Sequence, residues 1–209
     1  MNRRSLAILP LLVLAAFATT GAGLLAQSAA EAASTEADEF GGPFSLLDQG
    51  GKRRTEKDFR GKYMLVFFGY TYCPDACPTA LAVQAQAFEE LGPLSNRIAP
   101  IFVTVDPKRD TPERLKEYLS AFDGKPPSAR PKFIGLTGND EEIAAIAKGY
   151  RVIYQAHMAG HPGNFVEYTV DHTTDIYLMN PEGKFAAYYT LGISPPELAA
   201  DLKSKLSAR

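Results

Sequence analysis

The stretch F-F-G-Y-T-Y-C-P-D-A-C-P-T-A-L, residues 67–81, decides the fold of this chain. It contains both cysteines of the protein, Cys73 and Cys77. A short apolar run precedes it, and a helix-compatible run, residues 79–91, follows. Because proline is favoured in the first turn of a helix, Pro78 predicts that Cys77 lies at a helix start. Unpaired N–H groups at such a position favour a thiolate, which both metal binding and disulfide exchange require.

The rest of the chain alternates predicted strands with predicted helices, which indicates an α/β sheet covered on both faces. A cysteine pair between the first buried strand and a helix is typical of a thioredoxin-like fold. We therefore expect a central mixed sheet flanked by helices, with an N-terminal hairpin extension and a histidine-bearing insert loop. Strands are expected at residues 64–68, 101–105, 133–136, 151–154 and 165–170, helices at 79–91, 112–122, 140–148 and 195–206, and hairpin turns at 48–52 and 180–183.

The N-terminus has the composition of an export signal. Two arginines precede an uncharged run that begins leucine-rich and is also long enough to form a membrane helix. Export in either form places the folded part at the periplasmic face of the inner membrane, anchored or soluble. We expect residues 1–30 to be an export signal or N-terminal membrane anchor, residues 31–39 a flexible linker, and residues 40–209 a thioredoxin-like domain.

The charge pattern and the cysteine spacing narrow the function. The net charge is −2 without a block of five like charges, which argues against a nucleic-acid partner held through phosphates. Cys73 and Cys77 are only four positions apart, so a disulfide between them closes a very small loop and stabilises the fold little. In an exported protein such a pair is better suited to redox or metal chemistry than to a structural bridge.

Three motifs together resemble a known family. They are C-P-D-A-C-P at residues 73–78, V-D-P-K-R-D-T-P-E at residues 105–113, and V-D-H-T-T-D-I-Y-L-M-N-P-E-G-K-F at residues 170–185. With their spacing, they are similar to the Sco (SenC) proteins, which are thioredoxin-fold copper chaperones for cytochrome c oxidase assembly. The likeness covers most of the chain from residue 40 onward.

The resemblance implies that Cys73, Cys77 and His172 bind copper. Two thiolates and one imidazole suit Cu(I), and an added weak ligand lets the same set hold Cu(II). Zinc fits the set as well, with a fourth position left open. His172 is expected in a polar loop just before a strand, where thioredoxins carry a cis-proline. The implied partners are the copper-site subunit of cytochrome c oxidase, other periplasmic copper chaperones or thiol–disulfide proteins, and the membrane if the N-terminal segment is uncleaved.

A second function stays open, that of a thiol–disulfide oxidoreductase acting on the cysteines of a copper-receiving partner. Cys73 would attack the partner disulfide and Cys77 would resolve the mixed disulfide. Such an enzyme has no need of His172, whereas a copper site does. A peroxiredoxin is a weaker alternative, because Thr71 lies two residues before Cys73 and not three.

Several polar residues near the motifs have a functional and a plain interpretation. Asp75, Asp106 and Asp171 are candidates for orienting the ligands from outside the metal's own shell. Equally, Asp106 can cap a turn and Asp75 can be an exposed loop acid. His157 and His161 are either an auxiliary metal site or a solvated loop, and the sequence favours the solvated loop.

Overall fold

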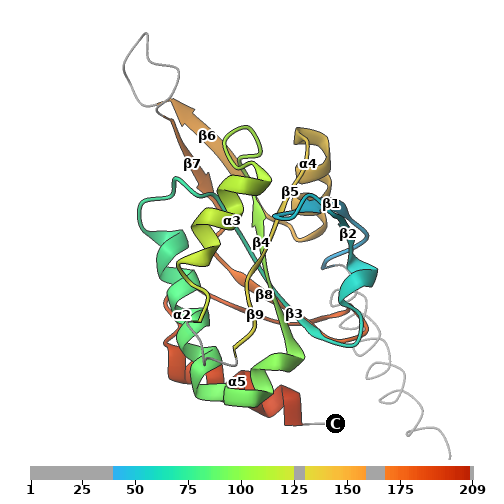
Figure 1. The fold of residues 1–209 in the computed structure, drawn as a ribbon, viewed down its shortest axis with the longest axis vertical. Helices are drawn as coiled ribbons and strands as arrows, with labels where there is room; N and C mark the ends of the chain where they lie inside the picture. The colour runs from blue at the N-terminus through green and yellow to red at the C-terminus, as the bar shows by residue number, and fades with distance from the viewer. Residues whose placement is uncertain (1–39, 125–129, 159–167, 208–209) are drawn as a thin grey trace, which may run out of the picture. The chain divides into compact units, whose positions relative to one another are not determined.

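A computed structural model describes residues 40–124, 130–158 and 168–207 of the chain. Within these residues a seven-stranded sheet has the order β2-β1-β5-β4-β3-β8-β9, and a separate two-stranded sheet is formed by β6 and β7 (Figure 1). The strands are β1 (Ser45–Asp48), β2 (Arg53–Thr55), β3 (Tyr63–Gly69), β4 (Ile98–Thr104), β5 (Ile134–Thr137), β6 (Tyr154–Met158), β7 (Tyr168–His172), β8 (Ile176–Met179) and β9 (Phe185–Tyr189).

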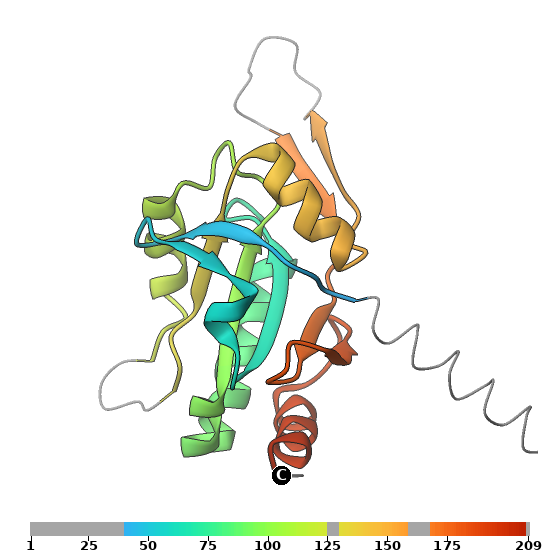
Figure 2. The ribbon, with the colours of Figure 1, turned by 90° about the vertical axis from the view of Figure 1, so that its right-hand side faces the viewer.

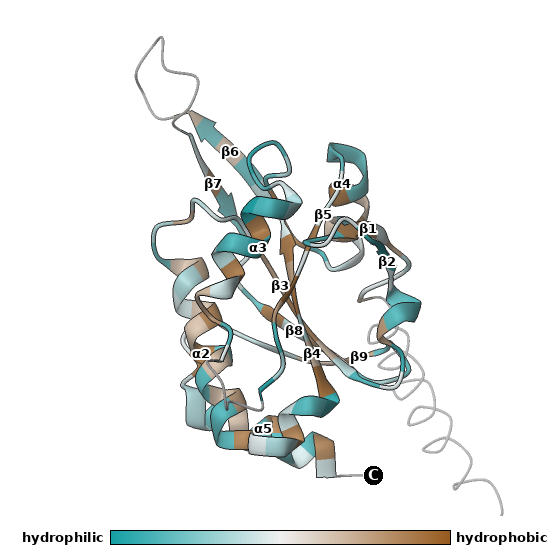
Figure 3. Cartoon of the chain, in the orientation of Figure 1, coloured by the Kyte–Doolittle hydropathy of each residue, from teal (hydrophilic) through white to brown (hydrophobic). Residues whose placement is uncertain are grey.

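The centre of the large sheet is its most apolar part. Strands β3 and β4 pair in parallel from Tyr63–Ile98 to Gly69–Thr104, and every residue of both strands is buried. Continuous apolar runs of this kind are expected of strands covered on both faces. In Figure 3 both strands are coloured mainly as hydrophobic, whereas the surrounding helices mix hydrophobic and hydrophilic residues.

Helices cover both faces of the sheet, which confirms the predicted α/β arrangement. The connections β3–α2–β4 and β4–α3–β5 advance across the sheet in one direction, so right-handed crossovers place α2 and α3 on the same face. Helix α5 packs against α2, and α4 lies on the opposite face (Figure 2). The helices are η1 (Glu56–Phe59), α2 (Ala76–Leu91), η2 (Gly92–Arg97), α3 (Pro112–Ser120), α4 (Asp140–Gly149) and α5 (Pro195–Ser207).

The local signals in the sequence set the helix starts as expected. The Thr111 side chain accepts a hydrogen bond from the backbone N–H of Arg114 at 3.3 Å, and Pro112 follows it in the first turn of α3. Asn139 and Glu142 form a reciprocal capping box at α4. The predicted N-terminal hairpin is also confirmed, since β1 and β2 pair antiparallel at the edge of the sheet.

The β6–β7 hairpin differs from the prediction. Strands were expected at residues 151–154 and 165–170, but β6 and β7 pair from Tyr154–His172 to Met158–Tyr168. The two strands project beyond the large sheet (Figure 1) and are exposed along much of their length. Their sequence therefore lacks the regular alternation of apolar and polar residues from which strand ends are predicted. As a result His157 lies in a strand and not in a loop, and His172 is the last residue of β7.

Residues 1–30 and 31–39 lie outside the described residues, and the assignments of signal, anchor and linker stay predictions.

Of the helices in the described parts of the chain, none is both long and apolar enough to cross a membrane.

Candidate metal centre

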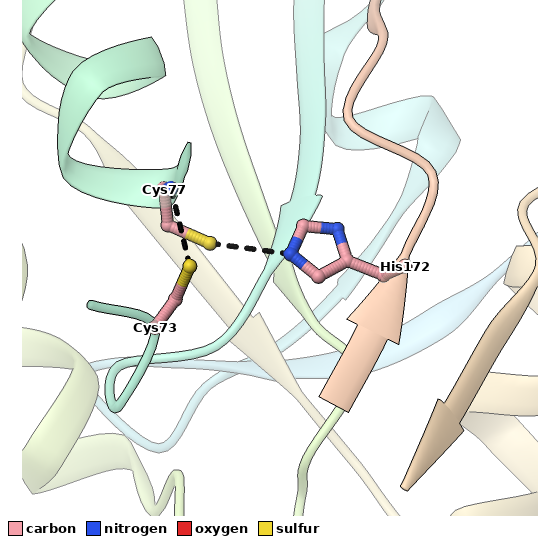
Figure 4. Close-up of side chains that lie close together, drawn as sticks. All are labelled: Cys73, Cys77 and His172. Atoms are coloured by element: carbon pink, nitrogen blue, oxygen red, sulfur yellow. Dashed lines mark hydrogen bonds between the residues drawn. The ribbon is translucent and has the colours of Figure 1, made fainter. Parts of the chain in front are cut away.

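Three side chains from distant parts of the sequence converge at one end of the large sheet. Cys73 comes from the loop after β3, Cys77 from the first turn of α2, and His172 from the end of β7. Their side chains point toward one another (Figure 4). The Sγ of Cys77 lies 3.4 Å from Nε2 of His172, and the three potential ligand atoms all lie within 4.8 Å of one another. The sequence-predicted ligand set is therefore assembled in space.

The start of α2 fixes the two sulfurs relative to each other. The helix begins at Ala76, which confirms that Cys77 lies in its first turn. The backbone N–H of Cys77 donates to Sγ of Cys73 at 3.3 Å, so this sulfur takes the place of a helix-capping oxygen. Cys77 is fully buried, whereas Cys73 is half-buried. His172 is half-buried as well, so the cluster meets solvent through Cys73 and His172.

The two thiols share one proton unequally. A hydrogen bond from the Cys77 thiol lowers the pKa of Cys73 to about 4. Backbone N–H groups of Cys77 and Asp75 act in the same direction, against the opposing effect of burial. The bond to Cys73, together with burial, raises the pKa of Cys77. In the reduced, metal-free protein Cys73 is the thiolate, and metal binding by both sulfurs releases the proton held at Cys77.

This asymmetry predicts how the free thiols react with an alkylating agent. We expect Cys73 to be modified by iodoacetamide at a nearly constant rate down to about pH 6, with half the rate near a pH of about 4. An ordinary cysteine, with a pKa of about 8.5, is almost entirely protonated at about pH 6 and reacts slowly there. Mass spectrometry of the modified peptides separates the two cysteines, and Cys73→Ser should leave a slowly reacting Cys77. A midpoint for Cys73 near that of a free thiol would contradict the assignment.

Gly69 lets the strand end pass close to the buried sulfur. A Cβ at this position would lie 2.7 Å from Sγ of Cys77 and 2.9 Å from the ring of Phe102. Atoms at such distances overlap, so a side chain at residue 69 would displace either the sulfur or the core ring. The sequence analysis did not single out this glycine, which directly precedes Y-T-Y-C in the motif.

His172 is oriented by the backbone next to it. Its Nδ1 lies 2.9 Å from the carbonyl oxygen of Thr173. A carbonyl only accepts hydrogen bonds, so Nδ1 carries the proton and Nε2 presents its lone pair to the sulfurs. The rings of Phe67 and Tyr70 meet the imidazole edge to face, with centroids 6.1 and 5.9 Å away. These contacts hold the ring in the orientation that a metal ligand needs.

The three acids expected to orient the ligands take other partners. The carboxylate of Asp106 pairs with Arg109 and accepts a hydrogen bond from the hydroxyl of Tyr168 at 2.5 Å. Asp171 lies 3.0 Å from His157, on the face of the hairpin opposite His172. The exposed carboxylate of Asp75 accepts a hydrogen bond from the hydroxyl of Thr79 at 3.3 Å, and only the backbone N–H of Asp75 contacts the Cys73 sulfur. His161 lies outside the described residues.

The acid that does support the site is Asp110, which the sequence analysis missed. It is fully buried, and its carboxylate accepts hydrogen bonds from the backbone N–H and hydroxyl of Thr71 at 3.0 and 2.7 Å. The hydroxyl of Thr104, at the end of β4, donates to the same carboxylate at 2.6 Å. Burial raises the pKa of Asp110. The network ties the loop that carries Cys73 to the neighbouring strand.

The donor set fits a soft metal ion. Ligand atoms around one ion, at bond lengths of roughly 2.0–2.3 Å, lie about 3.5–4 Å apart. The separation of 3.4 Å between Sγ of Cys77 and Nε2 of His172 is close to that range. Two sulfurs with one imidazole are the ligands that Cu(I) prefers.

Comparison with known proteins identifies a family match over most of the chain. The family model described as SCO1/SenC matches residues 32–207. The chain is 37% identical over 169 residues to the mitochondrial SCO1 homolog of Homo sapiens, and the match covers 80% of this chain. It spans only 53% of that relative, so the human protein is much longer than the shared region.

Solved structures of ScoI proteins match the fold of this chain. The copper-bound ScoI of Arabidopsis thaliana matches with a TM-score of 0.71 and 37% identity, covering 81% of this chain and 99% of that one. The copper-bound ScoI of Bradyrhizobium japonicum matches with a TM-score of 0.69 and 43% identity, covering 79% and 98%. The folded domain therefore corresponds to nearly the whole of each of these structures.

Proposed function

Because this chain belongs to the SCO1/SenC family, we propose that it binds copper through Cys73, Cys77 and His172 and delivers it to cytochrome c oxidase during assembly of the oxidase. The observation that carries the proposal is the convergence of two sulfurs and one imidazole within 4.8 Å of one another. Copper-bound structures of two similar proteins support the choice of copper over zinc. The receiving protein is proposed to be the subunit that holds a copper site.

The burial of the ligands suggests how copper leaves. Cys77 is fully buried, whereas Cys73 and His172 are both half-buried. An incoming thiolate or imidazole from the partner therefore replaces one of the two half-buried ligands first, and Cys77 exchanges last. Reprotonation of Cys77, whose thiol form is favoured in the metal-free site, completes the release.

The N-terminal segment supports an exported location. Residues 1–30 carry two arginines followed by a long uncharged run, which is typical of a signal peptide or a membrane anchor. The proposal places the copper domain at the periplasmic face of the inner membrane.

A second function is favoured by the unequal thiols. The thiolate of Cys73 attacks one sulfur of a partner disulfide, and the other partner sulfur leaves as a thiolate. Cys77 then loses its proton and attacks Cys73, which releases the second partner thiol and leaves a disulfide in this protein. The electrons lost by the two cysteines reduce the partner. Both functions use the same pair, and only copper binding needs His172.

A competition titration tests the copper proposal. Reduced protein is titrated with Cu(I) in the presence of a chromogenic chelator, and one copper per chain is expected. Alkylation of Cys73 beforehand should abolish binding, because the modified sulfur can no longer act as a thiolate ligand. Full binding by the alkylated protein would show that copper is held elsewhere.

A further inference from the structure

A row of stacked side chains begins beside Cys73 and reaches the β6–β7 hairpin. Tyr72 directly precedes Cys73, and the guanidinium carbon of Arg109 lies 4.7 Å from the centroid of its ring. The same atom lies 3.6 Å from the centroid of Tyr168, which pairs with Met158 across the hairpin. Tyr72, Arg109, Tyr168 and Met158 therefore form one continuous strip, named here the tyrosine–arginine strip.

Both ends of the strip are exposed. Tyr72 is 53% exposed and Met158 is 65% exposed. In the described parts of the chain only Ile153 and Tyr188 are other large apolar side chains with comparable exposure. Ile153 borders a shallow pocket, lined mostly by polar residues, on the face of the hairpin opposite Met158, and Tyr188 lies on β9, so neither belongs to the strip. Two exposed apolar side chains at the ends of one strip beside the metal site mark a candidate interaction surface.

The strip is held in place before any partner binds. The ring of Tyr72 is contacted by a second guanidinium, that of Arg114, at 5.1 Å from its centroid. Arg109 is fixed in turn by its ion pair with Asp106 and by a hydrogen bond of 3.0 Å to the carbonyl oxygen of Tyr168. Cation–π contacts of this kind hold the tyrosine ring outward without burying it. A rigid exposed aromatic loses little conformational freedom on binding, which favours a binding hot spot.

A groove adjoins the strip at its hairpin end. Its volume is about 310 Å³, and Tyr168 and Met158 form part of its wall. The size is at the lower end of ligand pockets, which suits a few side chains of a protein segment better than a large cofactor. Its other apolar lining residues come from the loop after β4 and from β6 and β7: Val105, Pro107, Tyr154, Ala156 and Val170. The remaining lining residues are polar or charged: Asp106, Lys108, Asp140 and Gln155.

We propose that the tyrosine–arginine strip and this groove are the docking surface for the protein that receives copper, and that the partner binds through an apolar segment next to its own metal-binding cysteines. The inference rests on the proposed function. Cys73 is the more accessible of the two sulfurs and directly follows the exposed Tyr72, so a partner thiolate that reaches Cys73 brings its flanking residues onto the strip. The groove receives an apolar side chain of that segment.

A binding titration of the copper-free protein tests the surface directly. The probe is the isolated copper-site domain of the same organism's cytochrome c oxidase, with Kd measured by calorimetry. Tyr72→Ala and Met158→Ser are each expected to raise Kd about tenfold or more, as for hot-spot truncation. Tyr72→Phe keeps the ring stacked and should bind like the natural protein. Tyr188→Ala, which removes a 58% exposed tyrosine from β9, is the matched control and should leave Kd unchanged.

Transfer of Cu(I) to a small-molecule chelator separates docking from ligation. A chelator needs no docking surface, so the loaded Tyr72→Ala and Met158→Ser proteins should give up copper to it at the natural rate. Equal Kd values for these two variants and the Tyr188→Ala control would overturn the proposal. Slowed transfer to the chelator would also overturn it, because the strip would then act on the metal site. A natural protein that docks but takes up no copper would instead count against the proposed function.

Discussion

Replacing His172 with alanine is expected to weaken Cu(I) binding by roughly a hundredfold or more. The imidazole is one of three proposed ligands, and even the loss of a residue that merely orients a ligand costs about 10–100-fold in metal affinity. Its Nε2 lies 3.4 Å from Sγ of Cys77, and an alanine side chain has no donor atom to replace it. Affinity is measured by competition with a chelator on the reduced protein. Disulfide exchange should be largely retained, because the cysteine pair remains.

The chain offers a matched control for this substitution. His157 lies on β6, half-exposed, and pairs with Asp171 on the face of the hairpin opposite His172. His157→Ala should leave copper affinity and disulfide exchange unchanged. If His172→Ala bound copper as tightly as His157→Ala, the ligand assignment of His172 would be wrong, and the oxidoreductase function would become the better account.

Asp110→Ala is expected to lower the free energy of unfolding by roughly 2–4 kcal/mol. The substitution leaves two hydroxyls and one backbone N–H, from Thr71 and Thr104, without their acceptor in the buried interior. Each unsatisfied buried polar group costs about 1–3 kcal/mol, and partial rearrangement of the hydroxyls offsets part of the sum. Urea denaturation of the reduced, metal-free protein measures the change.

The control for Asp110 is an acid without buried partners. Asp171→Ala removes an exposed carboxylate, so its effect should stay within about 0.5 kcal/mol. Copper binding by folded Asp110→Ala should also weaken, since the loop that carries Cys73 loses its attachment to β4. Unchanged stability of Asp110→Ala would contradict the role given to this network.

The sequence allowed prediction of the features that depend on local residue order. The cysteine pair, the proline after it and the apolar run before it indicate a strand, a loop and a helix start without reference to the rest of the chain. The third ligand came from a resemblance to known proteins and not from spacing. Nothing local brings His172 next to residues almost a hundred positions earlier; the antiparallel pairing of β8 with β3 does so.

The role of Asp110 was hidden for a different reason. In the sequence V-D-P-K-R-D-T, Asp106 and Asp110 look alike, and only burial separates an acid paired with Arg109 from one that holds the loop of Thr71. The bounds of β6 and β7 were also missed, because an exposed two-stranded hairpin has little apolar alternation to mark its ends. Tertiary contacts, and not local pattern, decide both features.

X-ray absorption spectroscopy of the copper-loaded, reduced protein tests the central claim most directly. The account predicts one copper per chain with two sulfur ligands at about 2.2–2.3 Å and one nitrogen ligand at about 2.0 Å, the nitrogen being lost in His172→Ala. A copper ion without sulfur neighbours, or an unchanged spectrum for His172→Ala, would contradict it.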